Sequence, residues 1–310
     1  IESFASFSFA KGHSASYAVE SYQSLWLKAH HPLEFMVAVA NNFGGFYRTE
    51  FYLHEAKRAG AAVEAPCINT SGELCTLVHS GSPPSKPRIY LGLGNIRSLP
   101  AEAVALILGE RRRQGPFSDL HDLLRRVPLH ADQARALIRT GALRFTGKGK
   151  PRLLWDLTLL HRPSRAPAGG DLFAARVEEP RLPGLEHHPL ADAFDELELL
   201  GFPLCDPFDL VAEGHAEAPR PGIPRILARE MAAHAGRRVE MLGYMIHVKS
   251  TTTSAGSLMS FGSFIDPAGD FWDSTQFPDV AARHPFGGRG VYRLAGVVEE
   301  EFGHYALRTT

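Results

Sequence analysis

The chain has 310 residues, of which 44% are hydrophobic and 22% charged, and its formal net charge at pH 7 is -1. A chain of this length can bury a substantial core and is expected to form two or three modules. No apolar run approaches the roughly 18 to 20 residues that span a bilayer, and the first residues lack the pattern of a signal peptide. These features argue against a membrane or secreted protein, and we predict a cytoplasmic location.

The cysteines are three in number, Cys67, Cys75 and Cys205, and their spacing matches neither a disulfide framework nor a zinc site. The first residue is Ile1, and the phenylalanine-rich sequence that follows it is typical of the interior of a domain. We therefore expect a fragment of a longer protein.

Charge is distributed unevenly along the chain. Residues 86–165 contain about 16 Lys and Arg against about 6 Asp and Glu, whereas residues 166–310 contain about 12 against about 21. A basic segment between less basic neighbours indicates either a nucleic-acid contact or a solvated helix face.

The first predicted elements are helices. Over residues 14–42, Ser14 is a candidate N-cap, apolar residues recur every three or four positions, and Pro32 divides the segment in two. A third helix is predicted from about Thr49 to Ala59, ending at Gly60. Residues 61–88, rich in Pro and Gly, are interpreted as an irregular linker that could contain short strands.

From residue 89 to about 160 the pattern predicts compact helical hairpins, with helices over 101–113, 117–126 and 131–140. A Pro- and Gly-rich linker at 161–170 and an acidic stretch follow.

After about Arg237 the period changes from 3.6 to 2, which indicates strands. Five short strands are predicted, with a small helix near 280–283. This pattern suits an oligonucleotide-binding barrel, and a β-sandwich is the alternative.

Residues Lys11 to Ser14 open the first predicted helix, where free backbone N–H groups and the helix dipole favour anions. Taken alone, a basic residue and a capping serine before a helix are common.

The surrounding residues make this signal more specific. The segments FAKGHSASYA (9–18) and WLKAHHPLEFM (26–36) closely resemble the fingers domain of bacterial DNA polymerase III alpha subunits and their error-prone relatives. The resemblance implies that Lys11 and His13 contact the triphosphate of the incoming nucleotide. Many family members have Asn and Ser at the positions of Ala10 and Gly12.

The resemblance continues in order along the chain, through YLHEAKR (52–58), IYLGLGNIR (89–97), GPFSDL (115–120), LIRTGAL (137–143) and LLGFPLCDP (199–207). It implies a tandem helix-hairpin-helix module that contacts DNA phosphates without reading bases. Pro100 offers no N–H at the first hairpin, so basic side chains become the expected contacts. These DNA-binding candidates are Arg97, Arg111, Arg112, Arg113, Lys148 and Lys150.

The motif GDLF (170–173) lies where the family often carries a sliding-clamp peptide. Asp171, Leu172 and Phe173 are therefore candidate clamp-binding residues, although Gly169 replaces the usual Gln. Aromatic residues of the predicted barrel are candidates for stacking on unpaired bases or for core packing, namely Tyr244, Phe261, Phe264, Trp272 and Phe277.

We therefore expect a multidomain α+β chain. Its predicted segments are the C-terminal part of a fingers domain (1–65), a helix-hairpin-helix module (66–165), a linker with a candidate clamp peptide (166–235) and an oligonucleotide-binding-fold domain (236–310).

The implied function is that of part of a DNA-directed DNA polymerase, acting in replication or lesion bypass. The implied partners are primer-template DNA, dNTP, the sliding clamp and other replisome subunits. The catalytic carboxylates and their Mg²⁺ are expected outside this chain, so the fragment alone is expected to be inactive. The alternatives are a non-enzymatic DNA-binding accessory or repair protein and, more distantly, an aminoacyl-tRNA ligase.

Overall fold

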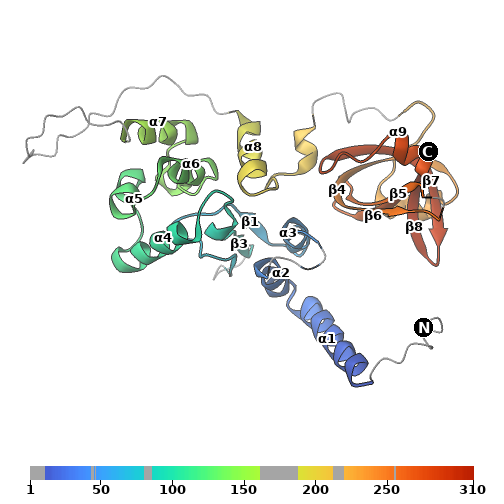
Figure 1. Ribbon diagram of the computed structural model, residues 1–310, viewed down its shortest axis with the longest axis horizontal. Coiled ribbons are helices and arrows are strands. Elements are labelled where there is room, and N and C mark those ends of the chain that lie inside the picture. Colours follow the sequence, from blue (N-terminus) through green and yellow to red (C-terminus); the bar gives the residue numbers. More distant parts are fainter. Residues whose placement is uncertain are drawn as a thin grey trace, which may run out of the picture. The chain divides into compact units, whose positions relative to one another are not determined.

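The structure, a computed structural model, divides into two compact units, Ile1–Leu204 and Cys205–Thr310 (Figure 1). The described residues are 11–42, 45, 47–79, 86–160, 188–211, 220–254 and 256–310. Among the described helices, none has both the length and the apolar character needed to cross a membrane.

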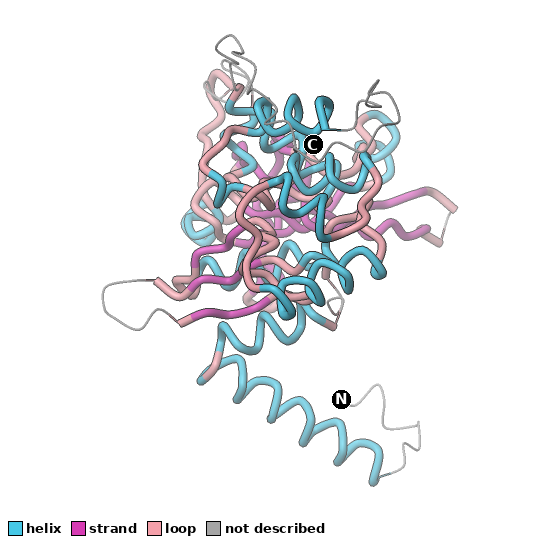
Figure 2. The backbone as a smooth tube through the Cα atoms, turned by 90° about the vertical axis from the view of Figure 1, so that its left-hand side faces the viewer, coloured by secondary structure: helices cyan, strands magenta, loops and turns pink. Residues whose placement is uncertain are grey.

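Unit 1 begins with three helices, as predicted: α1 (Lys11–His30), α2 (Pro32–Asn41) and α3 (Thr49–Arg58). Pro32 occupies the first turn of α2, where its missing N–H costs nothing, and Gly60 follows α3 with φ 97°. The predicted N-cap role of Ser14 is wrong, because this residue lies inside α1. Figure 2 shows α1 extending away from the rest of unit 1.

The short strands that we expected the segment 61–88 could contain are present, but the segment is not an irregular linker. It contains three short strands, β1 (Ala62–Glu64), β2 (Thr76–Val78) and β3 (Arg88–Tyr90), in the order β1-β3-β2. Strand β3 pairs in parallel with β1 and in antiparallel with β2. Cys67, Ile68 and Cys75 between the strands are buried, so the segment is part of the core.

Side-chain amides fix this small sheet to its neighbours. Asn41 of α2 donates from Nδ2 to the Cys75 carbonyl (2.9 Å) and accepts from the Cys75 N–H at Oδ1 (2.8 Å). Asn69 makes the same pair of bonds with the backbone of Phe117, at 2.8 and 2.9 Å. Each asparagine therefore forms hydrogen bonds with one backbone N–H and one backbone carbonyl that strand pairing leaves unsatisfied.

The rest of unit 1 is helical, with short 3-10 turns η2 (Leu93–Asn95) and η3 (Arg144–Thr146) and the helices α4 (Ala101–Gln114), α5 (Leu120–Arg126), α6 (Ala131–Arg139), α7 (Lys150–Leu160) and α8 (Pro189–Leu199). Helix α5 begins later than predicted because Asp119 accepts the N–H of Asp122 (2.8 Å) and so acts as its N-cap. Helix α8 falls in the stretch that we described only as acidic.

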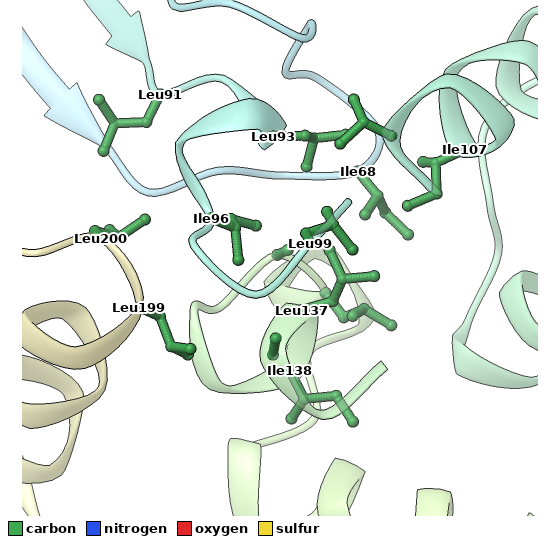
Figure 3. Close-up of a cluster of buried hydrophobic side chains, with 14 of the residues drawn as sticks. Ile68, Leu91, Leu93, Ile96, Leu99, Ile107, Leu137, Ile138, Leu199 and Leu200 are labelled. Atoms are coloured by element: carbon green, nitrogen blue, oxygen red, sulfur yellow. The ribbon is translucent and has the colours of Figure 1, made fainter. Parts of the chain in front are cut away.

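One hydrophobic core runs through unit 1. It joins side chains of α2 and α3, the small sheet, α4 to α7 and the end of α8, where Leu199 and Leu200 pack near Ile96 and Leu99 (Figure 3). The core continues across residues 65 and 66, so the packing has no boundary there. The predicted four-segment division stays a prediction.

Unit 2 contains the 3-10 turns η4 (Pro207–Leu210) and η5 (Ala228–His234), the strands β4 (Arg238–Thr252), β5 (Leu258–Ile265), β6 (Phe271–Gln276), β7 (Val291–Glu301) and β8 (His304–Thr309), and the helix α9 (Pro278–Arg283). The five strands and the small helix lie where we predicted them. Pairing runs β4-β5-β6-β8-β7 and returns to β4, which closes a barrel and rules out the sandwich alternative. Only β6 and β8 pair in parallel among these strands.

Two aromatic rings fill the barrel interior. Phe264 and Trp272 stack with ring centroids 4.7 Å apart, and both are buried. Gly243 of β4 makes room for them, since a Cβ there would lie 2.6 Å from Trp272 Cζ2 and 2.7 Å from Phe264 Cβ. Strand alternation therefore places these aromatic residues in the core.

Candidate nucleic-acid interface

The six predicted DNA-contacting residues lie at three places in unit 1. Arg97 precedes α4, the three arginines Arg111 to Arg113 end it, and Lys148 and Lys150 lie at the start of α7. Helix α4 has 14 residues and is therefore about 20 Å long. Arg97 and the three arginines consequently lie at opposite ends of this helix.

Arg111 has a structural role. Its Nη1 donates to the carbonyl oxygens of Ile68 (2.7 Å) and Ser71 (2.8 Å), which ties the end of α4 to the loop between β1 and β2. Burial lowers the pKa of the Arg111 guanidinium from its ordinary value. This residue is less available to a phosphate than the sequence suggested.

The two arginines that follow are exposed to solvent. Arg113 forms an ion pair with Glu110, one turn earlier, at 2.9 Å. Arg112 has no acceptor among the described residues. Of the three arginines at the end of α4, Arg112 is therefore the cation best able to engage an external phosphate.

The loop before α4 is occupied by contacts within unit 1. The backbone N–H of Arg97 donates to the Leu199 carbonyl at the end of α8 (2.9 Å). Its exposed side chain passes over Gly201, where a Cβ would lie 2.1 Å from Nη2. The first hairpin can therefore offer the guanidinium of Arg97 to a phosphate, but not this backbone donor.

The basic loop before α7 is partly neutralised. Lys148 Nζ lies 3.1 Å from Asp156, a carboxylate that also accepts from Arg152 Nε at 2.9 Å. Lys150 forms ion pairs with Asp192 and, at 3.6 Å, with Asp195, both on α8. Lys150 therefore attaches α8 to α7, whereas Lys148 is exposed beside Asp156.

Helix α8 lowers the net positive charge of the basic segment. In addition to its contacts with Lys150, it holds Arg139 of α6 through Asp195 (2.7 Å) and Glu198 (3.1 Å). These hydrogen bonds, that of Glu198 foremost, raise the pKa of the Arg139 guanidinium. The acidic residues Asp192, Asp195 and Glu198 recur every three positions, a helical spacing that could have indicated this docking face.

Sequence reasoning also missed a buried arginine. Arg126 lies with its guanidinium carbon 4.1 Å from the centroid of the Phe117 ring and donates from Nη2 to the carbonyls of Glu110 (2.7 Å) and Gly115 (2.9 Å). It also pairs with Asp122 at 3.0 Å. Arg126 therefore connects the end of α4 to α5, and the spacing of Asp122 and Arg126 was its only local signal.

Lys11 and His13 lie in the first turn of α1 as described. The His13 side chain is exposed, and its ring lies 4.6 Å from that of Tyr17. The side chain of Lys11 lies outside the described residues. Large apolar side chains of α1 are also exposed, namely Tyr17, Val19, Tyr22, Leu25, Trp26 and Leu27.

The predicted stacking candidates of unit 2 separate into two groups. Tyr244, Phe264 and Trp272 are all buried, and Phe264 and Trp272 belong to the barrel core. Phe261 and Phe277 are exposed, as is Phe271, which we did not single out. The period of two along the strands predicted such a separation without saying which residues face outward.

No Mg²⁺ site is formed by the described residues, in which no group of three or more His, Cys, Asp or Glu side chains is placed to hold a metal. The run Glu299 to Glu301 does not fit the ion: Glu299 pairs with Arg308, and Glu300 accepts the Gly303 N–H at 2.6 Å. The candidate clamp peptide, Asp171 to Phe173, lies outside the described residues.

Comparison with known proteins agrees with this architecture. Residues 60–153 match a family model described as helix-hairpin-helix motif. The chain is 36% identical over 196 residues to the error-prone DNA polymerase of Mycobacterium bovis, covering 62% of this chain and 17% of that protein. It is 30% identical to the DNA polymerase III alpha subunits of Thermus aquaticus and Caulobacter vibrioides, covering 84% and 87% of this chain.

The matched part of these two alpha subunits is 22% and 24% of their length, so the chain spans less than a quarter of the relatives named here. A solved structure from Klebsiella pneumoniae, described as a candidate nucleic acid-binding lipoprotein, has a TM-score of 0.22 and 15% identity over 26% of this chain and 73% of that one. That likeness supports no conclusion. The sequence relatives do support a conclusion: this chain is homologous to error-prone DNA polymerases and DNA polymerase III alpha subunits, and its residues 60–153 match the helix-hairpin-helix motif.

Proposed function

We propose that the chain is part of a DNA-directed DNA polymerase that adds deoxynucleotides to a primer during replication or lesion bypass. The observation that carries the proposal is the alignment of 84% of this chain with a DNA polymerase III alpha subunit, at 30% sequence identity. The helix-hairpin-helix match supports a contact with the primer-template duplex. The catalytic carboxylates and their Mg²⁺ would lie in the rest of the longer protein.

The duplex would be held by side chains that the internal contacts of unit 1 leave exposed. Arg97, Arg112 and Lys148 are the contacts that we propose, with Arg113 weakened by its ion pair to Glu110. Arg111 and Lys150 would act indirectly, because their polar groups hold the loop after β1 and helix α8. Such contacts attract phosphates of any base sequence.

Helix α1 would carry the nucleotide-binding residues Lys11 and His13. Its exposed apolar side chains support an interface with another region of the polymerase, since the chain spans less than a quarter of its relatives.

Asp171, Leu172 and Phe173 would bind the sliding clamp. The barrel would be an oligonucleotide-binding fold, supported by its five-stranded closed pairing and by the exposed rings of Phe261, Phe271 and Phe277.

The test is a primer-extension assay that compares this chain with the full-length gene product, with duplex binding measured in parallel. We expect extension by the longer protein alone and duplex binding by both. Duplex binding without any extending gene product would instead favour the accessory or repair protein.

The nucleotide contact has a separate test in the full-length enzyme. Lys11→Ala should weaken apparent dNTP affinity about tenfold or more, as expected when a charge-assisted hydrogen bond is removed. Lys28→Ala, near the other end of α1, is the matched control. Unchanged incorporation kinetics in Lys11→Ala would remove the triphosphate role.

A further inference from the structure

A charged glutamate is fully buried on the wall of the barrel. Glu240 of β4 has no exposed surface, while its neighbours Val239 and Met241 point into the barrel core. Because side chains alternate along a strand, Glu240 lies on the outer face. The segment 224–226 lies beside β4 at this point, since the Glu240 N–H donates to the Pro224 carbonyl (2.9 Å) and its carbonyl accepts the Ile226 N–H (3.0 Å), and Arg225 and Glu240 form a parallel bridge.

Three arginines converge on this carboxylate. Arg225 donates to Oε1 from Nη2 (2.7 Å) and Nε (3.0 Å). The Nε atoms of Arg220 and Arg293 lie 3.8 and 3.9 Å from Oε2, beyond hydrogen-bonding distance. Oε2 is buried and has no hydrogen-bond partner among the described residues.

Two of the three guanidinium groups around this carboxylate reach the surface. The side chains of Arg220 and Arg293 are 51% and 41% exposed. Strand pairing places Arg293 opposite Leu242, which shares the outer face with Glu240. Arg238, two residues before Glu240, is exposed on the same face and adds a further positive charge.

We propose that Arg220, Arg225 and Arg293 form a phosphate-binding site on the outer face of the barrel, with Glu240 gathering the three guanidiniums beneath it. Arg220 and Arg293 each face Oε2 through Nε, so their Nη1 and Nη2 groups lie farther from the carboxylate and can bind two oxygens of one phosphate. A planar guanidinium fork suits this task better than a lysine.

The phosphate can come from a nucleic-acid backbone or from a free polyphosphate, and the chemistry is the same for both. This site goes beyond the proposed function, which places duplex contacts in unit 1 and base-stacking rings on the barrel at Phe261, Phe271 and Phe277. It does not include any of those residues, so it can be tested separately.

The test uses the 310-residue chain and two probes, a fluorescein-labelled twelve-residue oligo(dT) and inorganic tripolyphosphate. We expect the double variant Arg220→Gln, Arg293→Gln to weaken oligo(dT) binding about tenfold, as when one charge-assisted hydrogen bond is removed. The slope of log affinity against log salt should fall by about 0.7 for each phosphate that the variant no longer binds. Tripolyphosphate should compete with the oligonucleotide on the parent chain. Duplex binding through unit 1 should be unchanged.

The matched control is the double variant Arg283→Gln, Arg308→Gln, which removes the same charge from unit 2 outside the cluster. Arg283 bonds the Asp279 carbonyl of its own helix, and Arg308 pairs with Glu299. We call the Arg220→Gln, Arg293→Gln double variant the cluster variant. Oligonucleotide binding that weakens in the cluster variant but not in the control variant supports a nucleic-acid ligand.

If only tripolyphosphate binding, measured by calorimetry, weakens in the cluster variant, the ligand is a free polyphosphate. Equal weakening in the cluster and control variants, or unchanged binding of both probes in the cluster variant, would overturn the proposal. Hydrogen exchange of the barrel amides checks that each variant retains the parent fold.

Discussion

Arg111 donates from Nη1 to the Ile68 carbonyl at 2.7 Å, although Ile68 precedes it by 43 residues and is fully buried. The same nitrogen also reaches Ser71. Arg111→Ala should therefore lower the free energy of unfolding of unit 1 by about 2–3 kcal/mol, because it leaves two carbonyls without this donor. Urea unfolding followed by circular dichroism measures this decrease.

The neighbouring arginine provides the contrast. Arg112→Ala should change stability by less than about 0.5 kcal/mol, yet weaken duplex binding and reduce its salt dependence, with a slope change of about 0.9 per phosphate contact. Fluorescence anisotropy at several salt concentrations measures the slope. Equal destabilisation of the two variants would contradict the assignment of a structural role to Arg111 alone.

The ion pair between Arg139 and Asp195 should stabilise the docking of α8. In a double-mutant cycle of Arg139→Ala and Asp195→Ala, we expect a coupling energy of about 1–2 kcal/mol, because both groups are largely shielded from solvent. The cycle is measured by chemical unfolding. Arg135→Ala with Asp132→Ala, an exposed pair on α6, is the control and should couple by less than about 0.5 kcal/mol.

Glu196 should make stability depend on pH. Burial raises the pKa of its carboxyl, opposed by the N–H of Leu204 and by Lys150 and Lys57, and reinforced by Asp192. The folded protein therefore binds this proton more tightly than the unfolded chain. The resulting stabilisation is present at low pH and is lost as pH rises from the ordinary pKa, about 4.3, through the folded value.

Glu196→Gln removes this ionisation and retains an acceptor for the Leu204 N–H, which bonds Oε2 at 2.6 Å. At pH 7 the variant should be more stable by about 1 kcal/mol or less. Near pH 4 the difference should shrink. Thermal unfolding across this pH range measures it, and a variant that is less stable at pH 7 and equal at pH 4 would reverse the predicted sign.

Gly243→Ala should loosen the barrel. A Cβ at this position would lie 2.6 Å from the buried Trp272 ring, so the core must shift, at a cost of about 1–3 kcal/mol. Hydrogen exchange of the β4 and β6 amides reports on unit 2 separately from unit 1. Gly287→Ala, where the nearest atom lies 4.0 Å from the added Cβ, should leave exchange unchanged.

Local sequence patterns predicted the elements whose stability comes from regular alternation. The five barrel strands are six to fifteen residues long and carry a clear period of two, so their positions followed from the sequence. Strands β1 to β3 have three residues each, which is too short to show any period. Their place in the core depends on contacts with distant residues such as Asn41.

Local sequence patterns also could not distinguish the roles of the charged residues. Arg111, Arg112 and Arg113 are indistinguishable in sequence, and only the position of Ile68 and Ser71 in space makes the first of them structural. The ion pair of Lys150 with Asp192 joins residues 42 positions apart, with no local signal. Family resemblance indicated which residues could contact DNA, but not which of those side chains are already engaged in contacts within the fold.

The pairing of β8 with both β6 and β7 constrains how the barrel can form during synthesis. Until residues 304–309 have left the ribosome, β6 and β7 each keep an unpaired edge, and such edges readily pair with other chains. Closure therefore waits for the fifth strand. A nascent chain that has released β7 but not yet β8 therefore exposes both edges at once, and aggregation is most favoured in that interval.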